Sequence, residues 1–235
     1  MSAPVPPRSK IVYKPQRPGR FTAFVRTMWV LFGLGTLSLL LYVLAVSVNF
    51  MNLFGKMPNL KTLENPRSEL ASEVYSADGV LLGKYFRENR TPAEFKDLPQ
   101  NLIDALIATE DVRFFVHSGI DGTSLVGAVF SNLRGEKRGG STLTQQLAKN
   151  LYNTRRGETR GGLGYIPGVS LIIAKTKEWL TAVELEERYT KEEILRMYLN
   201  TVEYGSKAYG IKVAAKTYFS TSPDSLTTEQ VATLV

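Results

Sequence analysis

Apolar residues occur along the chain as one unbroken run near the N-terminus and as several shorter amphipathic stretches after it. No charged residue lies between Thr27 and Gly55, and Met28–Phe50 is a run of 23 residues rich in Leu, Val, Phe and Gly. About 20 apolar residues span the hydrocarbon core of a bilayer, so this run is long enough to cross a membrane. A secretory signal peptide would have a shorter apolar core and a small-residue cleavage site. The pattern therefore predicts one uncleaved transmembrane helix at 27–50.

Beyond this run, the spacing of apolar residues predicts a short β element followed by helices. The segment 73–86 alternates around Asp78-Gly79, a dipeptide that favours a hairpin turn. From Pro99 onward apolar residues recur three and four positions apart, as on one face of a helix. We therefore predict a mainly α fold with a small β element near the membrane, preceded by a single transmembrane helix. The expected helices lie around 102–107, 143–151, 170–188, 191–199 and 213–219, the last being the final helix, with a loop at 153–169.

Two of these helices begin with the spacing of a capping box. In that motif a Ser or Thr hydroxyl and a Glu or Gln side chain three residues later each bond a backbone N–H at the helix start. The two pairs are Thr142 with Gln145 and Thr190 with Glu193. They predict helices that begin directly after residues 142 and 190.

The net charge of +7 is concentrated at one end of the chain. Six basic residues precede the apolar run with no acidic residue among them, which places the N-terminus in the cytoplasm and the rest of the chain on the outer, periplasmic face. The tail 1–26 also holds five Pro and no periodic pattern, so we expect it to be disordered. From Lys56 onward 23 basic residues stand against 22 acidic ones, and we expect no nucleic acid as a partner. The six basic residues are Arg8, Lys10, Lys14, Arg17, Arg20 and Arg26.

The Cys and His content narrows the chemistry further. The chain has no Cys and one His, which excludes disulfides, a thiol nucleophile, Cys-ligated zinc and a multi-histidine metal cage. The one histidine, His117, lacks a partner pattern, and such a residue is more commonly structural than a catalytic base. Carboxylates are therefore the main candidates for acid–base chemistry.

Two glutamates stand out among the carboxylates. Glu110 follows the helix around 102–107, and Glu178 lies 68 residues later in the 170–188 helix. Two Glu residues facing one cleft would suit sugar chemistry, although a carboxylate at a helix end is more commonly a cap or a solvated charge. Residues 134–178 hold nine basic against three acidic residues, which suits an anionic substrate such as a phosphate ester; a solvated basic face is the alternative. The nine are Arg134, Lys137, Arg138, Lys149, Arg155, Arg156, Arg160, Lys175 and Lys177.

Five segments, taken in order, resemble the motifs of one enzyme family. The part of the chain from about Ser72 to Val235 is similar to the glycosyltransferase domain of class A penicillin-binding proteins, the lysozyme-like peptidoglycan glycosyltransferases of family 51 type. Five ordered motifs are far more specific than any one of them. The segments are Glu110-Asp-Val-Arg-Phe-Phe-Val-His117-Ser-Gly119, Gly140-Ser-Thr-Leu-Thr-Gln-Gln-Leu-Ala-Lys149-Asn150, Lys175-Thr-Lys-Glu178, Lys191-Glu-Glu-Ile-Leu-Arg-Met-Tyr-Leu-Asn200 and Gly210-Ile-Lys-Val-Ala-Ala-Lys-Thr-Tyr-Phe219.

The resemblance implies polymerisation of lipid II into glycan strands by an inverting displacement of undecaprenyl pyrophosphate. Glu110 would be the general base that takes the proton of the acceptor 4-hydroxyl. Glu178 would stabilise the departing pyrophosphate, either through a divalent cation (Mg or Mn) or by orienting basic neighbours. Lys149 and Lys175 would contact the pyrophosphate directly. The other substrate-binding residues that the resemblance implies are Asp111, His117, Ser141, Thr142, Gln145, Gln146 and Asn150.

The chain departs from the family pattern at two places. The third motif usually begins Arg-Lys, and Ala174 stands in place of the Arg, so its role in holding pyrophosphate would pass to Arg155, Arg156 or Arg160. The loop between the second and third motifs also looks longer than usual. The segment 73–86 resembles the bifunctional class, so we expect an N-terminal piece of a longer protein that carries a transpeptidase domain.

The resemblance also implies a domain plan and a location. We expect a cytoplasmic tail at 1–26, a transmembrane helix at 27–50, a juxtamembrane linker at 51–71 and a glycosyltransferase domain at 72–235, cut short at its C-terminus. The location would be the bacterial cytoplasmic membrane, and the partners would be lipid II, glycan linked to undecaprenyl pyrophosphate, the membrane and other cell wall synthesis proteins. Two other functions stay open: a lysozyme-like glycan hydrolase and a non-catalytic membrane scaffold that retains the fold.

Overall fold

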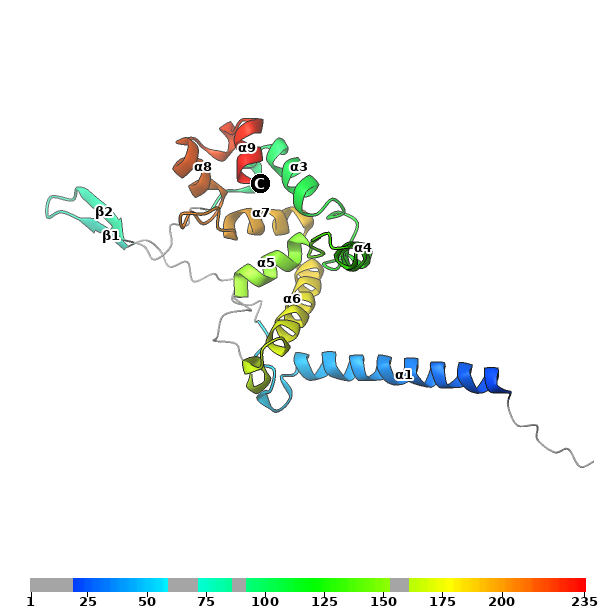
Figure 1. The fold of residues 1–235 in the computed structure, drawn as a ribbon. Helices are drawn as coiled ribbons and strands as arrows, with labels where there is room; N and C mark the ends of the chain where they lie inside the picture. Colours follow the sequence, from blue (N-terminus) through cyan, green and yellow to red (C-terminus); the bar gives the residue numbers. More distant parts are fainter. Residues whose placement is uncertain (1–18, 59–71, 86–91, 153–160) are drawn as a thin grey trace, which may run out of the picture. The chain divides into compact units, whose positions relative to one another are not determined.

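The computed structural model describes residues 19–58, 72–85, 92–152 and 161–235. These ranges contain eight α-helices and one two-stranded sheet, so the prediction of a mainly α chain is confirmed (Figure 1). The chain divides into two compact units, residues 1–44 and residues 45–235, which are described separately below.

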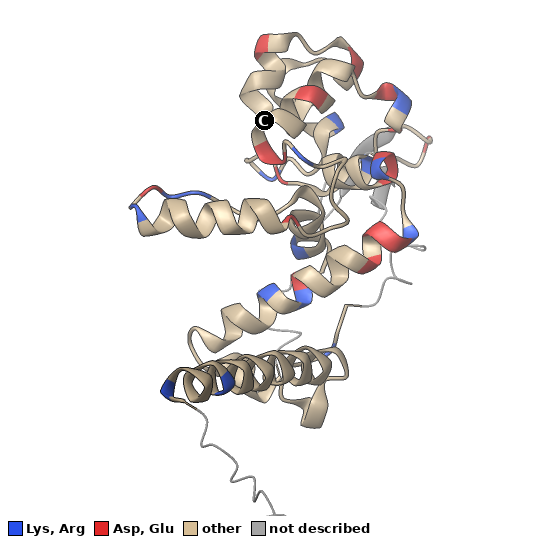
Figure 2. Cartoon of the chain, turned by 90° about the vertical axis from the view of Figure 1, so that its right-hand side faces the viewer, with Lys and Arg blue, Asp and Glu red and all other residues tan. Residues whose placement is uncertain are grey.

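The long N-terminal helix α1 runs from Arg20 to Ser47. Its mean hydropathy reaches 2.2, and after its first two turns it carries no charged side chain (Figure 2). An apolar helix of this length fits a single-pass membrane anchor. The expectation of disorder is wrong for residues 20–26, which are helical: no Gly or Pro interrupts them, and each residue added to an existing helix gains a hydrogen bond. The helix also ends before the predicted residue 50, because Asn49 is left-handed (φ 48°).

The β element is a hairpin of β1 (Ser72–Tyr75) and β2 (Leu81–Tyr85), paired antiparallel. The connecting turn contains Asp78-Gly79, as the sequence predicted, and Gly79 has a positive φ of 82° that favours glycine. The Ser76 hydroxyl accepts a hydrogen bond from the backbone N–H of Val80 at 3.1 Å, which helps to close the turn.

The segment that follows α1, within the unit 45–235, packs against a later part of that unit over the residues that the structure describes. After the short helix η1 (Phe50–Asn52), the carbonyl of Leu53 accepts a hydrogen bond from the N–H of Leu163 at 2.9 Å. Gly161 lies so close to the backbone of residues 53–55 that a Cβ at position 161 would overlap the nitrogen of Gly55. The expected linker 51–71 is therefore held in place at its beginning, and residues 59–71 lie outside the described part.

Seven α-helices follow the hairpin in the described residues of the unit 45–235. Two of them, α4 and α9, were missed by the sequence prediction, so α8 is not the final helix. Both missed helices have clear start signals: the Asp121 carboxylate accepts hydrogen bonds from the backbone N–H groups of Thr123 and Ser124, and Thr227 with Gln230 forms a capping box. The helices are α3 (Gln100–Glu110), α4 (Gly122–Leu133), α5 (Leu143–Tyr152), α6 (Val169–Arg188), α7 (Lys191–Thr201), α8 (Ile211–Phe219) and α9 (Thr228–Leu234). Three short helices, η2 (Phe95–Asp97), η4 (Gly162–Tyr165) and η5 (Pro223–Ser225), connect them.

Helix α5 lies at the centre of this unit, packed against both α6 and α7 (Figure 1). Its apolar face contributes Leu143 and Leu147, which are fully buried, whereas Leu151 is only partly buried. The facing side chains include Leu185 of α6 and Leu199 of α7, which are also fully buried. This packing fixes α5 between two helices, so polar residues on its remaining surface have defined neighbours.

Candidate active site

Glu110 is the last residue of α3, and its side chain is exposed. The helix stops there because the next residue, Asp111, leaves helical geometry (φ −158°). The Nε2 of Gln146 on α5 donates a hydrogen bond to Oε2 of Glu110 at 2.7 Å. Behind it, the hydroxyl of Tyr198 on α7 donates to Oε1 of Gln146 at 3.1 Å. A solvent-accessible carboxylate is thus held by one partner and otherwise open to a substrate.

The second glutamate, Glu178, has a different environment. Its side chain is 1% exposed, and its Oε2 lies 3.1 Å from Nζ of Lys175, one turn earlier on α6. The same Nζ donates to Oγ of Ser141 at 2.7 Å and to Oε1 of Gln145 at 3.1 Å. A buried carboxylate without a partner is costly, so Glu178 favours the position in which the Lys175 ammonium group lies beside it.

The two glutamates come from separate helices and are both joined to α5. Gln146 bonds Glu110, and the preceding residue, Gln145, bonds the Lys175 that pairs with Glu178. The structure therefore brings together six of the residues that the sequence motifs singled out. They are Glu110, Ser141, Gln145, Gln146, Lys175 and Glu178.

Asp111 and His117 form an internal pair. Their side chains are 4% and 7% exposed, and Nε2 of His117 lies 3.0 Å from Oδ2 of Asp111. The same carboxylate accepts a hydrogen bond from the N–H of Leu143, the first residue of α5, at 2.9 Å. These contacts attach the segment after Glu110 to the start of α5, which gives both residues a supporting position in the protein interior.

Thr142 and Gln145 also hold the backbone around Gly119. The Thr142 hydroxyl donates to the carbonyl of Gly119 at 2.7 Å, and Nε2 of Gln145 donates to the same oxygen at 3.0 Å. The N–H of Gln145 bonds the Thr142 hydroxyl at 3.2 Å, so one half of the predicted capping box is present. The second bond of the box, from the Thr142 N–H to the Gln145 side chain, is not made, because that side chain bonds the Gly119 carbonyl and the Lys175 ammonium group instead. At the start of α7, Thr190 and Glu193 form the complete box.

Several predicted residues lie apart from these contacts. Lys149 is exposed in the last turn of α5, and Asn150 beside it is partly exposed. Arg155, Arg156 and Arg160, which were expected to replace the missing arginine at Ala174, lie outside the described residues. Lys177 is buried, its Nζ donates to the carbonyl of Lys56 at 3.1 Å, and this burial lowers its pKa.

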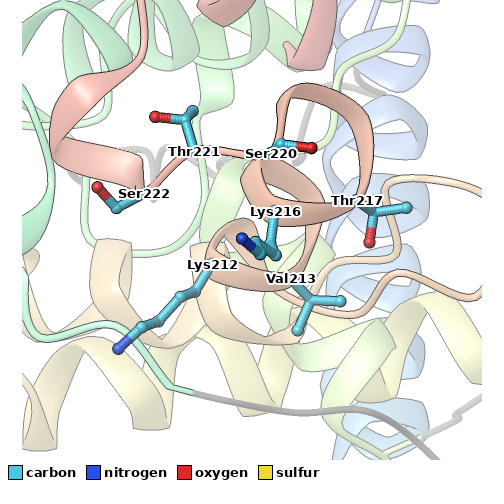
Figure 3. Close-up of a pocket in the computed structure, with 7 residues that line it drawn as sticks. All are labelled: Lys212, Val213, Lys216, Thr217, Ser220, Thr221 and Ser222. Carbon is cyan, nitrogen blue, oxygen red and sulfur yellow. The ribbon is translucent and has the colours of Figure 1, made fainter.

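The fifth motif lies at a different place in the fold. Its helix, α8, lines a pocket together with the turn that follows it (Figure 3). The residues that line it include Lys212, Lys216, Ser220 and Ser222. None of the six residues around Glu110 and Lys175 lines this pocket, so it is a separate feature.

Tyr198 belongs to this arrangement, although sequence reasoning named it only as part of the fourth motif. It lies on the buried face of α7 and is 5% exposed. A buried phenol needs a hydrogen-bond partner, and this was the signal that could have marked it.

Comparison with known proteins identifies the family of the chain. The transglycosylase family profile matches residues 78–235, so the chain belongs to the transglycosylase family. This match confirms the resemblance to the glycosyltransferase region of class A penicillin-binding proteins, which the five motifs indicated.

Three curated relatives show how far the similarity extends. The chain is 39% identical to penicillin-binding protein 1A of Haemophilus influenzae over 170 residues, which cover 71% of this chain and 18% of the relative. It is 34% identical to penicillin-binding protein 1A of Escherichia coli over 181 residues, covering 76% and 20%. For penicillin-binding protein 1F of Bacillus subtilis the identity is 36% over 166 residues, covering 70% and 21%. The chain thus spans about a fifth of the length of the relatives that it matches.

Proposed function

We propose that the outer domain, residues 72–235, polymerises lipid II into glycan strands and adopts a lysozyme-like fold. The observation that carries this proposal is the contrast between two carboxylates joined to one helix. Glu110 is exposed and free to receive a proton, whereas Glu178 is buried and holds Lys175. A proton acceptor beside a fixed positive charge suits attack by a hydroxyl and departure of a phosphate.

The reaction is a single displacement. Glu110 takes the proton from the 4-hydroxyl of the acceptor sugar as that oxygen bonds the anomeric carbon of the donor. The bond from this carbon to the pyrophosphate oxygen breaks, and its electron pair leaves on undecaprenyl pyrophosphate. Attack from the opposite face converts the α linkage to β.

Lys175 supplies the fixed positive charge for the leaving group. Its ammonium group is directed by Ser141, Gln145 and Glu178, and its side chain stays 28% exposed, so that a phosphate can reach it. Lys149, which is exposed on α5, provides a second cation for the same diphosphate. Asn150 and the Ser141 hydroxyl bind nearby sugar or phosphate oxygens.

A divalent cation at Glu178 is the other way to neutralise the diphosphate. Within the described residues no three Asp, Glu, His or Cys side chains converge on one point, and Oε2 of Glu178 is already paired with Lys175. Mg²⁺ or Mn²⁺ bound there would have one protein carboxylate and would take its other ligands from phosphate and water. We therefore assign the charge stabilisation to Lys175, and titration of activity with EDTA and Mg²⁺ tests this assignment.

The anchor keeps the site beside a lipid-linked substrate. We infer the orientation from the six basic residues before the apolar part of α1, which favour a cytoplasmic N-terminus and a domain on the outer face of the bacterial cytoplasmic membrane. Lipid II and glycan linked to undecaprenyl pyrophosphate are then substrates within reach of the membrane surface. Other cell wall synthesis proteins are the expected protein partners.

The experiment is incubation of residues 1–235, in detergent micelles, with labelled lipid II and, separately, with purified sacculi. The proposal expects long labelled polymer from lipid II and intact sacculi. Release of short glycan from sacculi without polymer would instead identify a hydrolase, and no change in either substrate would identify a non-catalytic scaffold.

A further inference from the structure

The hydrogen-bond chain behind Glu110 has a defined direction. Tyr198 donates to Oε1 of Gln146 at 3.1 Å, and Nε2 of Gln146 donates to Oε2 of Glu110 at 2.7 Å. An amide turned the other way would place its oxygen against a carboxylate oxygen, which is repulsive. The Glu110 carboxylate only accepts hydrogen bonds, so it selects the orientation in which the amide N–H groups face it. The Tyr198 hydroxyl then donates to the amide oxygen on the other side and holds the amide in this place.

The surroundings of Tyr198 keep its phenol hydroxyl protonated, so that it can donate a hydrogen bond. Its ring is 5% exposed in the core formed by α5 and α7, and its pKa is raised, mainly by burial and further by the charge of Glu110. The phenol therefore stays protonated at neutral pH and can donate to Gln146 throughout the working range.

Glu110 itself needs such a support. It is exposed at the end of a helix, where a glutamate side chain has several accessible rotamers. A general base has to lie within hydrogen-bond reach of the proton that it takes, so a fixed carboxylate is more effective than a mobile one.

We propose that Tyr198 is a positioning residue for Glu110, acting through the side-chain amide of Gln146. The phenol donates to the amide oxygen and restrains the amide, the amide N–H holds one carboxylate oxygen, and the second oxygen is left to accept the substrate proton. This inference rests on the proposed function of Glu110 as general base. It concerns the hydrogen-bond chain from Tyr198 through Gln146 to Glu110, and it requires no contact between Tyr198 and substrate.

The test is a double-mutant cycle with Tyr198→Phe and Gln146→Met, in which kcat and KM for lipid II are measured. Tyr198→Phe removes one oxygen and keeps the ring, so we expect kcat to fall about tenfold with KM and the thermal midpoint close to wild type. Added to Gln146→Met, the same change should have no further effect, because the chain is already broken. Gln146→Met leaves the core untouched and supplies a second variant if Tyr198→Phe fails to fold.

Tyr152→Phe is the matched control. Tyr152 also has a buried hydroxyl, on α5, but that hydroxyl has no hydrogen-bond partner among the described residues. Its change to Phe should leave kcat at the wild-type value.

Two results would overturn the inference while wild type is active and Glu110→Gln is inactive. One is an unchanged kcat in Tyr198→Phe. The other is an equal loss of kcat from this change in the presence and absence of Gln146, which would indicate an independent structural role. Failure of the proposed function is distinguishable, since it would appear as absence of polymer with wild type or as full activity of Glu110→Gln.

Discussion

Lys175 and Glu178 lie one turn apart on α6, and 3.1 Å separates Nζ of the lysine from Oε2 of the glutamate. The glutamate is buried and the lysine is partly exposed, so the carboxylate holds the ammonium group from the protein side and leaves its outer side to solvent. In the proposed mechanism, the buried acidic residue would thus serve a reaction on an anionic substrate without contacting that substrate.

Loss of the Glu178 charge should therefore reduce turnover. In Glu178→Gln the side chain keeps its volume, but Lys175 loses its anionic partner, and we expect kcat to fall about 10²- to 10³-fold. Polymerisation of labelled lipid II measures this loss. The matched control is Glu184→Gln on the same helix, whose carboxylate pairs with Arg188 at 3.0 Å on the surface. It should retain nearly full activity, because exposed ion pairs contribute little. Equal activity of the two variants would contradict the role of Glu178.

Gly119 should not tolerate a side chain. Its φ is 83°, a Cβ there would lie 2.8 Å from the backbone of Ala182, and its carbonyl receives the bonds from Thr142 and Gln145. We expect Gly119→Ala to lower the free energy of unfolding by about 3 kcal/mol or more, measured by denaturant titration.

Gly135→Ala separates the two causes of this loss. Gly135 has a similar φ of 85°, but a Cβ there would meet nothing within 4 Å, so only backbone strain is added. A loss of about 1 kcal/mol is expected there. If both variants lost the same amount, the close approach to Ala182 would be irrelevant.

Lys191 connects the first motif to α7 and should be important for stability. Its Nζ donates to the carbonyl of His117 at 2.7 Å, pairs with Glu186 at 2.8 Å and lies 4.3 Å from the ring centre of Phe114. Glu186 is 5% exposed, so Lys191→Met leaves a buried carboxylate without this partner and should cost about 3 kcal/mol. Arg188→Met, which removes a surface pair, serves as the control in the same denaturant titration. A smaller loss for Lys191→Met than for the control would refute this assignment.

The capping box of α7 predicts a pH-dependent contribution to stability. Hydrogen bonds from the backbone and side chain of Thr190 lower the pKa of Glu193. A carboxylate with a lowered pKa in the folded state stabilises the protein above its unfolded pKa of about 4.3, and this contribution is lost as the pH falls through the folded value.

The difference in unfolding free energy between wild type and Glu193→Ala should therefore be constant near neutral pH and shrink in acid below about pH 4. Denaturant titrations at several pH values measure it. Glu192→Ala removes a neighbouring carboxylate but no capping bond, and its difference from wild type serves as the reference. If the difference in unfolding free energy between wild type and Glu193→Ala stayed the same at low pH, the proposed contribution of the ionised Glu193 to capping would be contradicted.

Local signals in the sequence predicted most elements, and the two missed helices, α4 and α9, also carry local start signals. The hairpin at Asp78-Gly79 and the capping box at Thr190 depend on adjacent residues, so they could be read directly. Helix α4 was missed although its cap at Asp121 is local and its apolar residues, such as Val126, Val129 and Phe130, have helical spacing; in the structure these side chains are exposed.

The site was predictable as a set of residues and not as an arrangement. Glu110, Gln146 and Tyr198 are far apart in sequence. The packing of α5 against α7, together with the position of the end of α3 beside α5, brings them into one chain of hydrogen bonds. Asp111 and His117 illustrate the same limit. The motif marks them as important, but only the fold places them inside, where they hold the start of α5.

The most direct measurement of the central claim is polymerisation of labelled lipid II by Glu110→Gln compared with wild type. Gln keeps the size and shape of the side chain but cannot take a proton, so we expect turnover to fall by about 10²-fold or more with the fold intact. Glu187→Gln, an exposed carboxylate on α6, should match wild type. Wild-type turnover by Glu110→Gln would contradict the assignment of Glu110 as the general base.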